Sequence, residues 1–145
     1  MNNDKTTGEL LDVLHNTHSA TSLKAYREQH TVPEDTLAFN TEFSRLLEYH
    51  HLSKADVIRR SSLDRNYAYQ LFNGTRAPGR DKIIILSIAA GLSLKETQRL
   101  LTRASEGILY ARSSRDSIII YCIEHRLNLI STNEMLEDED EEILK

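Results

Sequence analysis

The sequence predicts an all-α protein. The 145-residue chain is rich in Leu, Ile and Ala but holds only five Gly and two Pro, its apolar residues recur at helical spacing, and Ser, Asp and Asn precede these segments as helix caps. A chain of this length fits one compact domain with appendages. We expect an N-terminal helical arm over residues 1–39, a central domain over 40–104, a helical hairpin over 112–136 and an acidic tail over 137–145.

The N-terminal arm is expected to begin with a disordered segment, residues 1–8, followed by short helices over residues 9–16 and 21–29. Thr31 and Glu34 have the spacing of a capping box and indicate the start of a further helix. The arm has no assignable function, and packing on the core or on a second subunit are both open.

The central domain is predicted to start with a helix that Asn40 caps, followed by two short helices within residues 52–74. Ser53 and Asp64 are the N-caps of these two helices. Gly74 ends the second one, because Gly adopts the left-handed backbone conformation without a Cβ penalty. The turn between the two helices is short enough to make a tight corner.

The second of these helices has one apolar and one polar face. Its polar face carries Asn66 and Gln70, with Tyr69 at the flank and Arg65 at the N-terminal end. Arg, Asn and Gln are the side chains that form paired hydrogen bonds to base edges in the major groove of DNA. The opposite, apolar stripe consists of Ala68, Leu71 and Phe72.

Residues 40–104 resemble the helix-turn-helix domain of the phage-repressor/Cro-like (Xre) family, and the resemblance implies a lambda-repressor-like fold that binds double-stranded DNA. The family reads bases with the first two residues and the sixth of its recognition helix, here Arg65, Asn66 and Gln70. Lys54 stands where the family often has a phosphate-binding Gln. Ser62 replaces the family's turn Gly, and a positive φ is expected there.

Further DNA contacts are expected around this helix. Tyr67 and Tyr69 can touch phosphates or thymine methyl groups, and the loop after the helix carries Arg76 and Arg80. The expected phosphate contacts are Lys54, Thr75, Arg76 and Arg80. The net charge of −4 counts against a nucleic-acid binder, but residues 42–82 hold eight Lys or Arg against five acids. The basic excess is small, so unspecific affinity should be modest.

An internal repeat follows, in which residues 80–101 align without gaps to residues 115–136 at an offset of 35, with ten identities. Both copies are expected to form helix, turn, helix, although their triple-Ile runs also favour strands. Gly91 and a Ser93 capping box organise the first copy, and Ser114 and Asn128 cap the second. A hairpin with so many apolar residues needs a partner, either the core or its own copy in a second subunit. We expect a homodimer.

The acidic tail includes six consecutive acids, residues 137–142. A frayed, solvated segment is the simpler interpretation. The alternative is a phosphate-mimicking strip that competes with DNA for the basic face.

Other functional classes find little support in the sequence. There is no phosphate-binding Gly-rich loop, nucleophile elbow or metal-ligand cluster, so we expect neither an enzyme nor a cofactor. His15 with His18, and His50 with His51, lack a third ligand nearby. The single Cys122 is expected to be buried and inert. With neither a signal pattern nor a membrane-length apolar run, a cytoplasmic protein is expected.

The leading hypothesis is a sequence-specific, double-stranded-DNA-binding transcriptional regulator, a dimeric repressor that reads the major groove with residues 64–73. The alternative is a helix-turn-helix fold used as a protein-interaction adaptor. It would bind a protein partner through residues 115–136 or the acidic tail.

Overall fold

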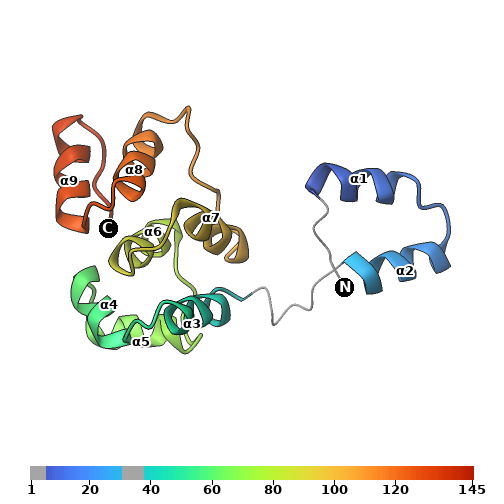
Figure 1. The fold of residues 1–145 in the computed structure, drawn as a ribbon, viewed down its shortest axis with the longest axis horizontal. Coiled ribbons are helices and arrows are strands. Elements are labelled where there is room, and N and C mark those ends of the chain that lie inside the picture. The colour runs from blue at the N-terminus through green and yellow to red at the C-terminus, as the bar shows by residue number, and fades with distance from the viewer. Residues whose placement is uncertain (1–5, 31–37) are drawn as a thin grey trace. The chain divides into compact units, whose positions relative to one another are not determined.

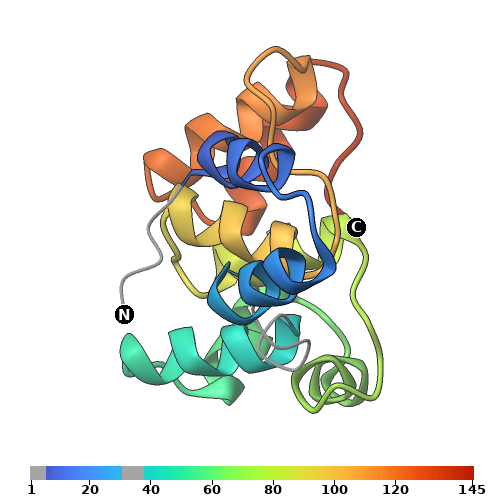
Figure 2. The same cartoon turned by 90° about the vertical axis from the view of Figure 1, so that its right-hand side faces the viewer.

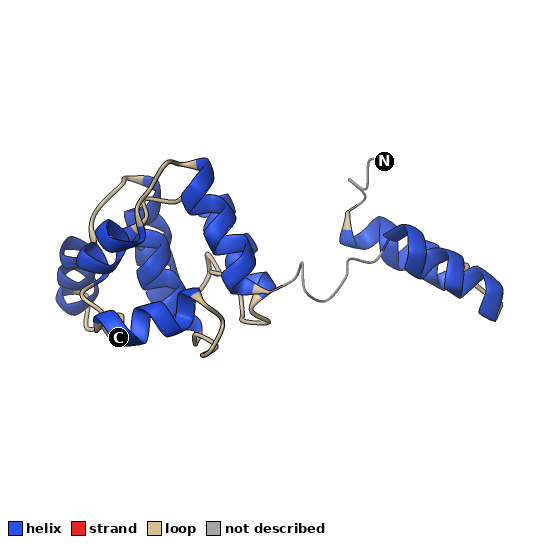
Figure 3. Cartoon of the chain, turned by 90° about the horizontal axis from the view of Figure 1, so that it is seen from below, coloured by secondary structure: helices blue, strands red, loops and turns tan. Residues whose placement is uncertain are grey.

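The computed structural model describes residues 6–30 and 38–145, and in these ranges it contains helices and no strands (Figures 1 and 3). The helices are α1 (Thr7–His15), α2 (Ala20–His30), α3 (Phe39–Tyr49), α4 (Lys54–Ser61), α5 (Arg65–Phe72), α6 (Arg80–Ala89), α7 (Leu94–Arg103), α8 (Ser114–Glu124) and α9 (Leu129–Asp138). The all-α prediction is therefore confirmed for the described residues. The chain divides into two compact units, residues 1–34 and 35–145.

The first unit is a pair of short helices. Thr6 caps α1 by accepting a hydrogen bond from the backbone N–H of Glu9, so the end of the segment expected to be disordered is helical, while residues 1–5 lie outside the described residues. The capping box expected at Thr31 and Glu34 also lies outside them. No residue of α1 is buried. The unit therefore has little core of its own.

The second unit is arranged in three tiers (Figures 1 and 2). Helices α3, α4 and α5 form one end, α6 and α7 the middle, and α8 and α9 the other end. Phe43 of α3 stacks on Phe72 of α5 with ring centroids 5.5 Å apart, α4 packs on α6 and α3 packs on α7. The apolar stripe of α5 is thereby fixed to the core, and its opposite face is left outward.

The predicted helix caps are confirmed at most positions. Ser53, Asp64 and Asn128 accept hydrogen bonds from the N–H groups three residues on, and Ser93 forms the full capping box with Glu96. Two caps were predicted wrongly. The cap of α3 is Ala38 rather than Asn40, and that of α8 is Ser113 rather than Ser114. The predicted start of a helix can be wrong by one or two residues where several cap-forming residues lie close together.

The internal repeat is a structural repeat and is longer than the predicted alignment. Arg80 donates to the carbonyl oxygens of Gly107 and Ile108, and Arg115 donates to those of Glu142 and Ile143, at the same offset of 35. Gln98 pairs with the backbone of Leu109 as Asn133 pairs with that of Leu144. Each copy thus runs from its Arg to an Ile-Leu pair, over residues 80–109 and 115–144.

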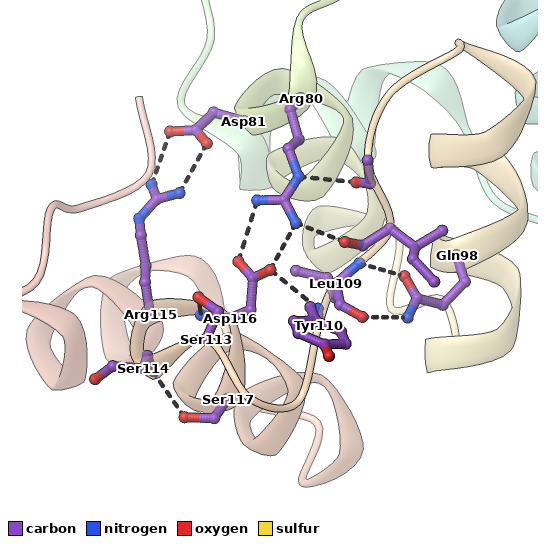
Figure 4. Close-up of polar contacts among 12 residues, drawn as sticks. Arg80, Asp81, Gln98, Leu109, Tyr110, Ser113, Ser114, Arg115, Asp116 and Ser117 are labelled. Carbon is purple, nitrogen blue, oxygen red and sulfur yellow. Dashed lines mark hydrogen bonds and ion pairs between the residues drawn. The ribbon is translucent and has the colours of Figure 1, made fainter.

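The two copies are joined by a pair of reciprocal ion pairs, which we call the double clamp (Figure 4). Arg80 of the first copy binds Asp116 of the second at 2.7 Å, and Arg115 of the second binds Asp81 of the first at 2.9 Å. Helix α6 packs on α9 as α7 packs on α8. Such an exchange of equivalent contacts is the mark of two-fold symmetry. The copies therefore form a pseudo-two-fold pair within one chain.

This pairing answers why the second hairpin is so apolar. Ile119, Ile123 and Leu136 are buried against the rest of the second unit, so the partner that the hairpin needs is the first copy. We expected a homodimer because the apolar hairpin needs a partner, and the first copy provides that partner within the same chain. Residues 112–136 are part of the second unit rather than a separate extension.

The C-terminal end is not frayed, which the simpler interpretation of the acidic tail had expected, although five of its six acids are exposed to solvent as that interpretation also expected. Helix α9 continues to Asp138, the Glu141 N–H binds the Leu136 carbonyl oxygen, and Leu144 is only 3% exposed. This segment completes the second copy, and its end returns to the start of α6, where the Lys145 N–H donates to Asp81.

Asp116 gives the double clamp a defined pH dependence. Burial raises the pKa of the Asp116 carboxyl, but the hydrogen bonds from Arg80 and the Tyr110 N–H, with the charge of Arg80, outweigh burial and hold this pKa below its ordinary 3.8. A lowered pKa stabilises the fold at pH values above 3.8, and this contribution is lost as the pH falls through the folded-state value.

We expect Asp116→Asn to lower the free energy of unfolding by about 2 to 3 kcal/mol at pH 7, since a charged, largely buried hydrogen-bond partner is lost. Asp81→Asn should cost less, about 1 to 2 kcal/mol, because the Asp81 side chain is more exposed. Urea titrations at pH 7 and pH 3 measure both. The loss of unfolding free energy caused by Asp116→Asn should be smaller at pH 3 than at pH 7. An equal loss at the two pH values would contradict the ionised state assigned to Asp116.

Leu144→Ala is expected to lower the free energy of unfolding by about 2 to 4 kcal/mol, the usual cost of a cavity at a buried Leu. Leu109→Ala, at the equivalent position of the first copy, should cost a similar amount. The exposed Ile130 provides the control, as Ile130→Ala should change stability by less than about 0.5 kcal/mol. If Leu144→Ala left the free energy of unfolding unchanged in the same urea titrations, the C-terminal segment would not be packed on the unit.

Candidate nucleic-acid interface

The candidate site is built on the corner between α4 and α5. Ser62 at the corner has φ of +59°, which confirms the left-handed conformation expected there. The buried Ser61 hydroxyl donates to the Ile58 carbonyl oxygen and accepts from the Leu63 N–H. Asp64 then caps α5 by accepting from the Tyr67 N–H at 3.0 Å. These local bonds set the direction in which α5 leaves the corner.

The outward face of α5 carries the predicted base-reading residues. Arg65 and Asn66 are exposed and Gln70 is half-buried, whereas Ala68, Leu71 and Phe72 are buried. Within the described ranges, the amide side chains of Asn66 and Gln70 form no hydrogen bond to another residue. Two amides with unused donors and acceptors are therefore presented side by side, one helical turn apart.

Four cations lie near α5, each against one of its aromatic rings. Lys54 lies 5.9 Å from the centroid of Phe72, and Arg65 lies 5.7 Å from that of Tyr69. Arg76 and Lys82 lie 5.6 and 5.8 Å from the centroid of Tyr67. Cations are attracted to ring faces by the ring quadrupole. Four positive charges thus lie against the aromatic residues of α5.

These four cations differ from five Arg side chains of the second unit, whereas Arg60, Arg103, Arg112 and Arg126 likewise have no carboxylate of the described residues within ion-pair distance. Arg45, Arg59, Arg80, Arg99 and Arg115 each lie within ion-pair distance of a carboxylate. In the part of the chain that the structure describes, no carboxylate lies that close to Lys54, Arg65, Arg76 or Lys82. The positive charge around α5 is therefore not neutralised within the chain.

The loop after α5 is held close to that helix. The Asn73 side chain accepts from the Thr75 N–H, and the Arg76 N–H binds the Gln70 carbonyl oxygen at 3.1 Å. Thr75 and Arg76 are both exposed. The structure thus brings these two predicted phosphate contacts to the same surface as the outward face of α5.

Arg80 does not belong to this surface, contrary to our expectation. Its guanidinium donates twice to Asp116 and once each to the carbonyl oxygens of Gly107 and Ile108 (Figure 4). These bonds engage all three guanidinium nitrogens, so Arg80 is not available to a phosphate. Lys82, two residues later, occupies the surface instead and was not predicted. A cation following the loop was the only sequence signal for it.

The His pairs and Cys122 are placed as follows. His50 lies 2.7 Å from Glu96 and joins α3 to α7, and His15 and His18 are exposed. Among the described residues, no three His, Cys, Asp or Glu side chains are grouped as metal ligands would be. Cys122 is buried, and burial raises the pKa of its thiol. No helix in the described ranges is long and apolar enough to cross a membrane.

Comparisons of the chain with protein-family models, curated proteins and solved structures found no match.

Ser62→Gly is expected to raise the free energy of unfolding by about 0.5 to 1 kcal/mol, because Gly has no Cβ to strain the left-handed backbone. Ser117→Gly, inside α8, is the matched control and should lower it by about 0.5 kcal/mol. Thermal unfolding followed by circular dichroism measures both shifts. Equal destabilisation by the two substitutions would contradict the corner geometry.

Proposed function

We propose that this protein binds double-stranded DNA sequence-specifically and regulates transcription, with α5 entering the major groove. The observation that carries the proposal is the ring of four cations, Lys54, Arg65, Arg76 and Lys82, held on the aromatic side chains of α5 without a carboxylate partner. DNA is the polyanion that such a surface fits, since phosphate contacts supply most of its unspecific affinity.

The residues divide into two roles. Asn66 and Gln70, with Arg65 at the start of α5, read base edges, because their side chains can form paired hydrogen bonds with adenine or guanine. Lys54, Thr75 and Arg76 bind phosphates and set the register of the helix on the duplex. Tyr67 and Tyr69 lie beside the amides and can add phosphate or thymine-methyl contacts.

Two further arguments support DNA as the ligand. Residues 40–104 resemble the Cro-like helix-turn-helix domain, whose recognition helix corresponds to α5. The negative net charge of the chain comes from residues 1–41 and 83–145, whereas residues 42–82, which include α5, hold eight Lys or Arg against five acids. The overall charge therefore does not describe the surface that would meet DNA.

The alternative is a protein-interaction adaptor, and one feature of α9 favours it. Ile130 is 67% exposed, and it lines a hollow of about 320 Å³ with Ile143 and three acids, Glu134, Glu137 and Asp138. An apolar centre with a charged rim is typical of a protein-binding surface. The adaptor function would use this end of the unit and leave the cations around α5 unused.

The two functions differ in what substitutions on α5 should do. If α5 reads bases, Asn66→Ala or Gln70→Ala costs about 1 to 3 kcal/mol of binding free energy on the preferred site and little on random DNA. Lys54→Ala or Arg76→Ala weakens both alike and lowers the slope of log affinity against log salt by about one unit. Binding titrations on a site selected from genomic fragments measure both effects.

Arg112→Ala serves as the matched control, because Arg112 is exposed in the segment between α7 and α8 and should leave the salt slope unchanged. All variants should keep their helical circular dichroism, since none removes a buried side chain. Full-length protein that prefers no fragment over random DNA would refute the proposal and leave the adaptor function.

A further inference from the structure

Three elements of the second unit converge on one ring, that of Tyr67. Tyr67 projects from α5, Arg76 comes from the loop after it, and Lys82 comes from the first turn of α6. The Arg76 Cζ and the Lys82 Nζ lie 5.6 and 5.8 Å from the Tyr67 ring centroid. No other aromatic ring of residues 38–145 has two cations against it.

This arrangement costs stability in the absence of an anion. Two positive charges held beside one ring repel each other, and the repulsion is only partly screened over such distances. Lys82 also lies in the first turn of α6, where the helix dipole disfavours a cation. Among the described residues, no carboxylate lies within ion-pair distance of either charge. The ring face offsets part of this cost, and a bound anion would remove much of the rest.

Both cations are also fixed at their backbones. The Arg76 N–H is bonded to the Gln70 carbonyl oxygen of α5. Lys82 lies two residues after Arg80, whose guanidinium anchors the start of α6 to the second copy of the repeat. The Tyr67 ring then restricts the long side chains that extend from these two fixed points. The pair is pre-organised, which reduces the entropy lost when it binds an anion.

We propose that Tyr67 is a positioning residue that holds Arg76 and Lys82 as a pair for the phosphates of one DNA strand beside α5. This rests on the proposed DNA-binding function and adds Lys82 to its phosphate contacts. The ring acts through the two cations, so its effect does not depend on the DNA sequence and does depend on the presence of Lys82.

The test is a double-mutant cycle on the full chain, with a random 20-base-pair duplex as the probe. Tyr67→Leu should weaken binding about five- to thirtyfold, because two long side chains are then no longer pre-ordered and must be immobilised on binding. Lys82→Gln alone should lower the salt slope by about one unit. In the Tyr67→Leu background, Lys82→Gln should weaken binding clearly less than it does alone, because the pair has already been released.

Tyr67→Phe separates positioning from a direct contact. It keeps the ring and removes the hydroxyl, so it should bind clearly more tightly than Tyr67→Leu. Tyr49→Leu is the matched control, since Tyr49 is 69% exposed and holds no cation, and it should bind normally. Melting temperatures of all variants, measured in parallel, identify any loss caused by unfolding.

Several outcomes would overturn the positioning role while leaving DNA binding in place. The first is that Tyr67→Leu binds the duplex normally, and the second is that the effects of Tyr67→Leu and Lys82→Gln on binding are additive. The third is that Tyr67→Phe binds as weakly as Tyr67→Leu. Wild-type protein that is folded and binds neither random nor selected duplex would instead overturn the proposed function, and the positioning role with it.

Discussion

The double clamp is the contact on which the arrangement of the second unit depends. Arg80 and Asp81 begin α6, Arg115 and Asp116 lie in the first turn of α8, and each Arg binds the Asp of the other copy. Each Arg also binds two carbonyl oxygens near the end of its own copy. One pair of residues per copy therefore closes the copy and joins it to its partner. This network holds the start of α6, which also carries Lys82.

The differences between the two copies follow from what covers each of them. Positions that are buried in both, such as Ile84 with Ile119 and Leu101 with Leu136, are identical except for Ser87 with Cys122. The first copy must also bury the side of α6 that packs on α4, and Leu86, Ala89 and Ala90 are buried there. The equivalent residues of α8 are exposed and more polar, namely Tyr121, Glu124 and His125. The sequence divergence thus marks the surface that only the first copy shares with α3, α4 and α5.

Local signals were sufficient to predict the helices but not the long-range contacts. The caps Ser53 and Asp64 and the stripe of α5 could be recognised because their partners lie within four residues. Arg80 was misjudged because its partner Asp116 is 36 residues away, and an Arg after a loop looks free without it. The acids of the tail are exposed as expected, but the tail was wrongly expected to be frayed. The sign of its packing was that the Ile-Leu pairs at 108–109 and 143–144 repeat at the offset already found.

The pseudo-two-fold pair has a consequence for how the protein behaves on dilution. An interface of this symmetry usually joins separate subunits and dissociates at low concentration. Here residues 110–114 tether the two halves, so each experiences the other at a high effective concentration that the linker sets and that dilution does not change. The scaffold behind α5 consequently stays assembled at any concentration of the protein, and only contacts between chains remain open to control by protein abundance.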